Sequence, residues 1–87
     1  MNMQTNIEER VRTILAEQFC VDADEIDLSA DLKQKYEGDS LDQVEIVMCA
    51  EDEFGCEIPD DEMFSIMTGQ QLVDLVTVRV SRKATAA

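Results

Sequence analysis

Hydrophobic residues return every three or four positions along most of the chain, which is the spacing of helices with one buried face. No stretch of useful length alternates apolar and polar residues as a half-buried strand would. The first expected helix begins near Thr5, because a hydroxyl followed three residues later by Glu8 fits a capping box. Its apolar face is expected to consist of Ile7, Val11, Ile14, Leu15 and Phe19. The pattern predicts an all-α fold.

A long connection is expected over residues 22–38, anchored to the helices by Ile26, Leu28 and Leu32. The second helix is expected from Leu41 to Phe54, and the following Gly55 is a natural helix stop. Ser40 and Gln43 have the spacing of a capping box at the start of this helix.

Two further helices complete the predicted architecture. A short third helix is expected at Pro59, which suits a first helical turn. Thr68 and Gln71 fit another capping box, and the last helix then carries an apolar side of Leu72, Val73, Val76 and Val80. We expect one domain over residues 1–87, a four-helix bundle with a core of about 5–80 and a disordered tail over 81–87.

Acidic residues dominate the composition, with 20 Asp and Glu against 7 Lys and Arg and a net charge of −13. No Lys or Arg lies between Tyr36 and Val78, whereas twelve Asp or Glu residues do. Nucleic acids and anionic membrane surfaces attract cationic groups, so neither is an expected partner. This charge favours a basic protein surface as the partner, although it could also serve solubility alone.

A zinc site is not expected, since the sequence has no histidine and its cysteines, Cys20, Cys49 and Cys56, form no CxxC pair. A calcium loop starting at Asp22 fails, because Asp27 and Lys33 occupy the positions that require Gly and Glu. We therefore expect no specific metal site. An odd cysteine count without a signal sequence favours the cytoplasm, with each cysteine buried as a small apolar residue. No apolar run reaches the length of a membrane span, so no membrane insertion is expected.

The expected second helix carries apolar residues on two opposite sides. Its core side consists of Gln43, Ile46, Val47, Ala50 and Phe54. The other side consists of Leu41, Val44 and Met48, interleaved with Glu45, Glu51 and Asp52. Such a mixed row is typical of a docking surface, in which carboxylates steer a basic partner and apolar side chains become buried on contact. The alternative is that the third helix covers the three apolar residues.

Ser40 stands alone at the start of this helix, where a serine can have one of three roles. A nucleophilic serine needs a general base, but there is no histidine, and Lys33 and Lys35 lie in a loop without a motif that would aim them. A helix cap is the common role of such a serine. Attachment of a phosphate-bearing group also fits, because the N-terminal end of a helix favours an anion.

Three segments of the sequence resemble the bacterial acyl carrier proteins: "GDSLDQVEIVMCAEDEFGCEIPDDE" over residues 38–62, "IEERVRTILAEQF" over 7–19 and "TGQQLVDLV" over 68–76. The resemblance needs no gap between Ile7 and Val76. It implies that Ser40, flanked by Asp39 and Leu41, carries 4′-phosphopantetheine, which a holo-acyl-carrier-protein synthase (a phosphopantetheinyl transferase) takes from coenzyme A. It also implies that the chain holds acyl groups as thioesters, can sequester them between helices, and catalyses no reaction itself.

The resemblance further implies a cytoplasmic monomer that serves the enzymes of fatty-acid synthesis or of a specialised lipid or polyketide pathway. These partners are ketosynthase, ketoreductase, dehydratase, enoyl reductase and acyltransferase, each with a basic docking patch. The surface they are expected to bind, here called the docking stripe, consists of Leu41, Asp42, Val44, Glu45, Met48, Glu51 and Asp52. The alternative function is an interaction module that keeps the carrier fold and binds a basic partner without carrying acyl groups.

The sequence departs from the family pattern just before the serine. Tyr36 and Glu37 stand where the family usually has leucine and glycine. Tyr36 can fill the same apolar site with its hydroxyl pointing outward, and Glu37 can change the turn of the loop. Ala50 and Met63 also differ in size from the usual residues and can reshape an acyl cavity. These departures favour a specialised pathway over the housekeeping one.

Overall fold

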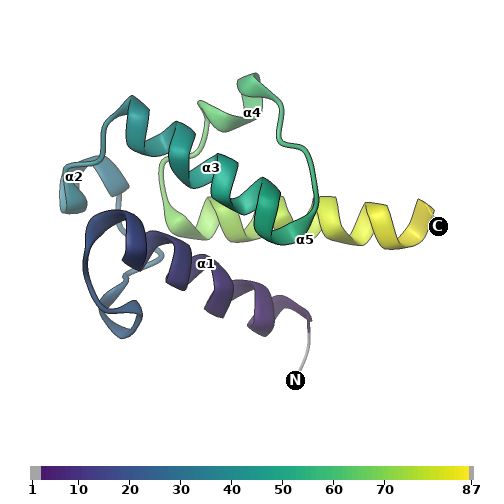
Figure 1. Cartoon of the computed structure of the whole chain (residues 1–87), viewed down its shortest axis with the longest axis horizontal. Helices are drawn as coiled ribbons and strands as arrows, with labels where there is room; N and C mark the ends of the chain where they lie inside the picture. Colours follow the sequence, from purple (N-terminus) through teal and green to yellow (C-terminus); the bar gives the residue numbers. More distant parts are fainter. Residues whose placement is uncertain (1–2, 87) are drawn as a thin grey trace.

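The structure is a computed structural model that describes residues 3–86, and within this range the chain is helical with connecting loops (Figure 1). The helices are α1 (Met3–Phe19), the 3-10 helix η1 (Ala23–Glu25), α2 (Leu32–Tyr36), α3 (Ser40–Phe54), α4 (Asp60–Met63) and α5 (Gly69–Ala86). The all-α prediction is confirmed.

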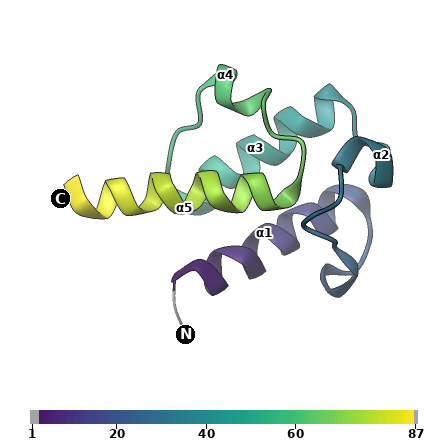
Figure 2. The ribbon, with the colours of Figure 1, turned by 180° about the vertical axis from the view of Figure 1, so that it is seen from behind.

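Helix α1 packs against both α3 and α5, and the core lies among these three long helices (Figure 2). The largest fully buried side chains are Val11, Leu15, Val47, Leu72, Val73 and Val76. Full burial of such a side chain stabilises a fold by about 1.5–3 kcal/mol. These residues lie on the apolar faces predicted from the helical spacing, so the amphipathic pattern accounts for the packing of the bundle.

The short helix α4 lies beside α3, on the side away from α1 (Figure 1). The side-chain amide of Gln43 donates to the carbonyl oxygens of Met63, at 2.9 Å, and Ile66, at 2.7 Å. Arg79 on α5 forms an ion pair with Glu62 on α4. A helix of four residues is too short to be stable alone, so these contacts hold it in place.

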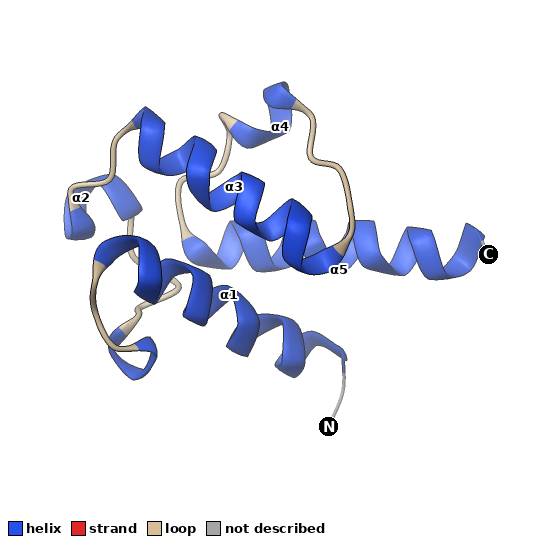
Figure 3. Ribbon diagram, viewed as in Figure 1, coloured by secondary structure: helices blue, strands red, loops and turns tan. Residues whose placement is uncertain are grey.

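The long connection between α1 and α3 is more ordered than the sequence pattern predicted, because it contains η1 and α2 (Figure 3). The side chain of Asp31 caps α2 by accepting hydrogen bonds from the backbone N–H groups of Lys33 and Gln34. The predicted anchors Ile26, Leu28 and Leu32 are all buried. The bundle thus has three long and two short α-helices in the described part of the chain, rather than four helices.

The helix ends differ from expectation at both termini. Helix α1 begins at Met3 rather than near Thr5, whose side chain lies outside the described residues. Helix α5 continues to Ala86, beyond residue 81 where the tail was expected to begin, and residue 87 lies outside the described part. Arg, Lys and Ala are strong helix formers, which explains why the helix extends beyond its core-facing turns. The capping box of Thr68 and Gln71 is confirmed by reciprocal hydrogen bonds of 3.1 and 3.0 Å.

The expected burial of the cysteines is wrong for two of the three. Cys20 is exposed because it follows the end of α1 in a left-handed backbone conformation, with φ at 58°. Cys49 is exposed because it lies beside Met48 on the outer side of α3, and Cys56 is half-buried. Cysteines are buried on average, but the position of each cysteine in the fold decides whether that side chain is exposed.

Glu37 ends α2 in the left-handed conformation, with φ at 58°, which a side chain with a Cβ adopts at a cost. We expect Glu37→Gly to stabilise the fold by about 1 kcal/mol, measured as a higher urea midpoint. Glu37→Ala is the matched control, because it removes the same charge but keeps the Cβ. A gain of equal size in both variants would show that charge, rather than backbone conformation, is the cause.

Candidate functional site

The start of α3 is capped by Asp39 and not by Ser40, which corrects the predicted capping box. The Asp39 side chain accepts a hydrogen bond from the backbone N–H of Asp42 at 2.9 Å. The Asp42 side chain accepts one from the backbone N–H of Asp39 at 3.1 Å, which completes the box. Ser40 is therefore the first residue inside the helix, and Gln43 is used to hold α4 instead.

Ser40 is exposed, and no described residue forms a hydrogen bond with its hydroxyl. The first N–H groups of a helix have no acceptor within the helix, and the helix dipole favours negative charge near them. The hydroxyl thus lies on the surface at a point where a phosphodiester would be stabilised. This arrangement fits a covalent phosphate-bearing group better than a cap, because the cap position is already filled by Asp39.

Asp42 connects the start of α3 to α1. The pKa of the Asp42 carboxyl is lowered, first by the hydrogen bond from the Asp39 backbone and then by the side chain of Gln18. The Gln18 amide donates to Asp42 at 2.7 Å and to Glu45 at 2.9 Å. One neutral side chain therefore holds two neighbouring carboxylates in place, and helical spacing alone gave no signal of it.

The lowered pKa of Asp42 predicts a specific pH dependence of folding. The folded pKa of Asp42 lies below the ordinary aspartate value of 3.8, so the carboxylate stabilises the fold above that value. This contribution is lost as the pH falls through the folded pKa. We expect the urea midpoint of Asp42→Asn to fall less than that of the wild type between neutral pH and about pH 3. Parallel curves for the two proteins would contradict the role given to Asp42.

A small pocket of about 50 Å³ opens beside the residues that precede Ser40. Gly38 and Asp39 form one part of its edge, and Asp42 and Gln43 form another. Its apolar lining consists of Phe19, Leu32, Ile46, Ile66 and Met67. The pocket offers sheltered apolar space to a group tethered near Ser40. Phe19 was predicted only as a core residue of the first helix, and its place in the pocket depends on the tertiary fold.

The docking stripe is exposed at two of its three apolar positions. Leu41 is 63% exposed and Met48 is 60% exposed, so the short third helix does not cover them. Val44 is half-buried and packs against the core. The alternative of a covered row is thus wrong for Leu41 and Met48.

The carboxylates of the docking stripe are not equivalent. Glu45 and Asp52 are exposed, and Glu45 also accepts from Gln18. Glu51 is half-buried and accepts a hydrogen bond from the backbone N–H of Ile58 at 2.8 Å. Glu51 therefore holds the loop after α3, whereas Glu45 and Asp52 are more exposed to solvent.

No cluster of three potential metal ligands occurs among residues 3–86. No described helix is both long enough and apolar enough to cross a membrane.

Comparisons with known proteins agree with this geometry. The family model described as the phosphopantetheine attachment site matches residues 9–76. Among solved structures, the acyl carrier protein from Enterococcus faecalis is similar, with a TM-score of 0.74 and 28% sequence identity, over 90% of this chain and 99% of that one. The chain therefore belongs to the phosphopantetheine attachment-site family, has a fold of the acyl-carrier type and uses covalent 4′-phosphopantetheine as its cofactor.

Proposed function

We propose that Ser40 carries the prosthetic group and that the chain transports acyl groups between the enzymes of a biosynthetic pathway. The observation that carries this proposal is the exposed Ser40 hydroxyl at the first position of α3, left without a hydrogen bond from the described residues because Asp39 forms the cap. The terminal thiol of the bound group supplies the chemistry, since it holds acyl groups as thioesters. The chain itself supplies position and recognition and acts as a carrier rather than as an enzyme.

Loading is a group transfer from coenzyme A, catalysed by a phosphopantetheinyl transferase. A bond forms between Ser40 Oγ and the phosphorus atom of the pantetheine arm, and the pyrophosphate bond of coenzyme A breaks. Adenosine 3′,5′-bisphosphate leaves, and the serine proton passes to a base on the transferase. Asp39 and Leu41 flank the reacting hydroxyl, and the α3 amide dipoles favour the new anion.

The docking stripe then presents the loaded arm to partner enzymes. Leu41 and Met48 offer apolar surface, while Asp42, Glu45 and Asp52 offer charge. Partners with basic patches would fit, namely the transferase, ketosynthase, ketoreductase, dehydratase, enoyl reductase and acyltransferase. We propose a cytoplasmic, monomeric, single-domain carrier, a setting that suits its exposed thiols.

We further propose a specialised pathway rather than housekeeping fatty-acid synthesis. Support comes from the positions that depart from the family pattern, namely Tyr36, Glu37, Ala50 and Met63. Glu37 lies in a left-handed turn, and Tyr36 stacks against a pocket residue. Loading with acyl groups by standard fatty-acid enzymes at normal rates would contradict this part of the proposal.

The carrier role is tested by intact-mass measurement after incubation with coenzyme A and a phosphopantetheinyl transferase. We expect a mass gain of one phosphopantetheinyl group per chain, followed by a second gain when an acyl group is loaded onto the thiol. An unchanged mass with a transferase that is active on another carrier would contradict the proposal and favour the interaction-module alternative.

A further inference from the structure

The ring of Phe19 forms one wall of the pocket beside Ser40, and its position is confined on two sides. Tyr36 stacks on the ring, with a centroid distance of 5.1 Å and an angle of 14° between the planes. The backbone of Gly38 approaches the ring edge so closely that a Cβ there would lie 3.1 Å from Phe19 Cζ. The wall is therefore fixed between α2 and the loop that leads to Ser40.

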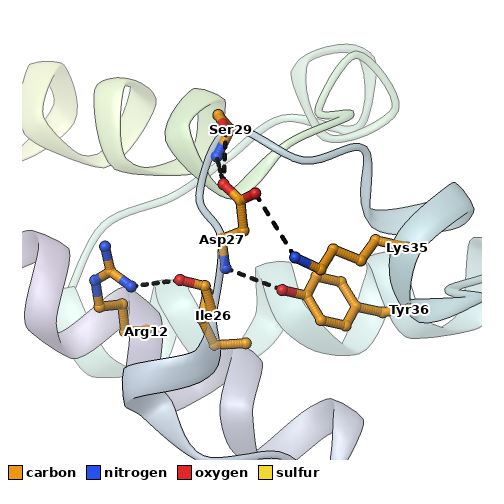
Figure 4. A network of polar contacts seen from close by, with 6 residues as sticks. All are labelled: Arg12, Ile26, Asp27, Ser29, Lys35 and Tyr36. Atoms are coloured by element: carbon orange, nitrogen blue, oxygen red, sulfur yellow. Dashed lines mark hydrogen bonds and ion pairs between the residues drawn. The ribbon is translucent and has the colours of Figure 1, made fainter.

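Tyr36 is itself anchored, as the close view of its surroundings shows (Figure 4). Its hydroxyl accepts a hydrogen bond from the backbone N–H of Asp27 at 2.9 Å, so the hydroxyl is engaged by the loop. The Asp27 carboxylate accepts two hydrogen bonds from Ser29, at 3.0 and 2.6 Å, and forms an ion pair with Lys35 at 3.6 Å. Arg12 on α1 donates to the neighbouring carbonyl of Ile26. The loop and α1 thus form a framework that keeps Tyr36 against Phe19.

We propose that the stacked Phe19–Tyr36 pair sets the length of the acyl group that this carrier shelters, so that short acyl groups are preferred. This inference rests on the proposed attachment at Ser40. The pocket volume of about 50 Å³ has room for about four water-sized groups. The pocket cannot grow past Phe19 while Tyr36 supports the ring. Phe19 is the specificity-determining residue, and Tyr36 is a positioning residue that acts through it.

The test compares melting temperatures of the holo-protein loaded with acetyl, butanoyl, hexanoyl and octanoyl groups. Each methylene that becomes buried should raise the melting temperature by about 3–6 °C. For the wild type we expect a rise from acetyl to butanoyl and no further rise beyond it. For Phe19→Leu and Tyr36→Leu we expect the rise to continue to hexanoyl or octanoyl. Tyr36→Phe keeps the ring but loses the hydrogen bond to Asp27, so it should give an intermediate profile.

Phe54→Leu is the matched control, because Phe54 is another half-buried aromatic residue packed on the core, at the opposite end of α3. This variant should lower all melting temperatures and leave the chain-length profile unchanged. A wild-type profile that rises through octanoyl would overturn the inference. So would a Phe19→Leu profile that runs parallel to the wild type, because a merely structural role shifts every loaded form equally.

Failure of the attachment proposal is visible separately, as the absence of a mass gain before any acyl group is loaded. In that case the effect of Phe19 on acyl length is tested by titrating free acyl thioesters of N-acetylcysteamine into the unmodified protein. Ring NMR signals of Phe19 and Tyr36 should then respond most to the butanoyl compound in the wild type. A response that grows with chain length in the wild type would overturn the inference in this arm as well.

Discussion

Replacing Ser40 with alanine is expected to abolish phosphopantetheine loading while leaving the folding free energy unchanged within about 0.5 kcal/mol. Loading should be lost because the Oγ atom is the proposed acceptor of the phosphoryl bond. Stability should be kept because the hydroxyl forms no hydrogen bond with a described residue and Asp39 provides the cap. Intact mass after incubation with the transferase, together with a urea unfolding curve, measures both quantities.

The two measurements distinguish Ser40 as the attachment site from Ser40 as the helix cap. If Ser40 were the helix cap, its replacement would cost about 1 kcal/mol. Asp39→Ala is the matched control for that cost, since it removes the observed cap one residue earlier. A stability loss in Ser40→Ala as large as in Asp39→Ala would contradict the assignment. If the Ser40→Ala variant still binds a basic partner, and such binding is the only activity found for the wild type, the interaction-module alternative is favoured.

Charge reversal in the docking stripe should slow association with the transferase. We expect Glu45→Lys or Asp52→Lys to lower the association rate constant about tenfold at low ionic strength, and by much less near 1 M salt. The reason is that both carboxylates are exposed, so they act mainly by steering a basic surface. Stopped-flow measurements at several salt concentrations give the rate constants directly.

Asp24→Lys provides the matched control for this prediction. Asp24 is exposed in η1 and lies outside α3, so its replacement changes the net charge equally. If it slows association as much as Glu45→Lys, then net charge rather than the docking stripe is responsible. Equal slowing at low and high salt would show that the affected contact is not electrostatic steering.

The sequence predicted the long helices well because their positions are decided by burial. The apolar residues of α1, α3 and α5 repeat at helical spacing, and Val11, Val47 and Val76 are fully buried as that spacing requires. Gly55 also ends α3 as predicted, in a left-handed conformation with φ at 62°. Strong local signals and tertiary packing agree at these positions.

Features that depend on contacts between distant segments were missed. Helix α2 has five residues, too few for a periodic pattern. Its first residue, Leu32, donates its backbone N–H to the carbonyl of Met67, a residue distant in the sequence. The choice of Asp39 over Ser40 as the cap was also not decided by spacing, because both residues have a partner three positions later.

In the candidate site, too, the features within one segment could be predicted and those that join distant segments could not. Ser40 and the exposed apolar positions of the docking stripe could be proposed from one continuous segment of sequence. The Gln18 bridge to Asp42 and Glu45, and the Phe19 wall of the pocket, come from α1 and needed the fold. Contacts across such sequence separations leave no periodic signal in a single chain.

Tandem mass spectrometry of peptides from the loaded protein identifies the residue that carries the phosphopantetheinyl group. The other serines of the chain are Ser29, Ser65 and Ser81. The hydroxyl of Ser29 donates to Asp27, and that of Ser65 donates to the carbonyl of Glu62. We predict the phosphopantetheinyl group on the peptide that contains Ser40 and unmodified peptides for the other serines. Modification at Ser29, Ser65 or Ser81, with an unmodified Ser40 peptide, would contradict attachment at Ser40.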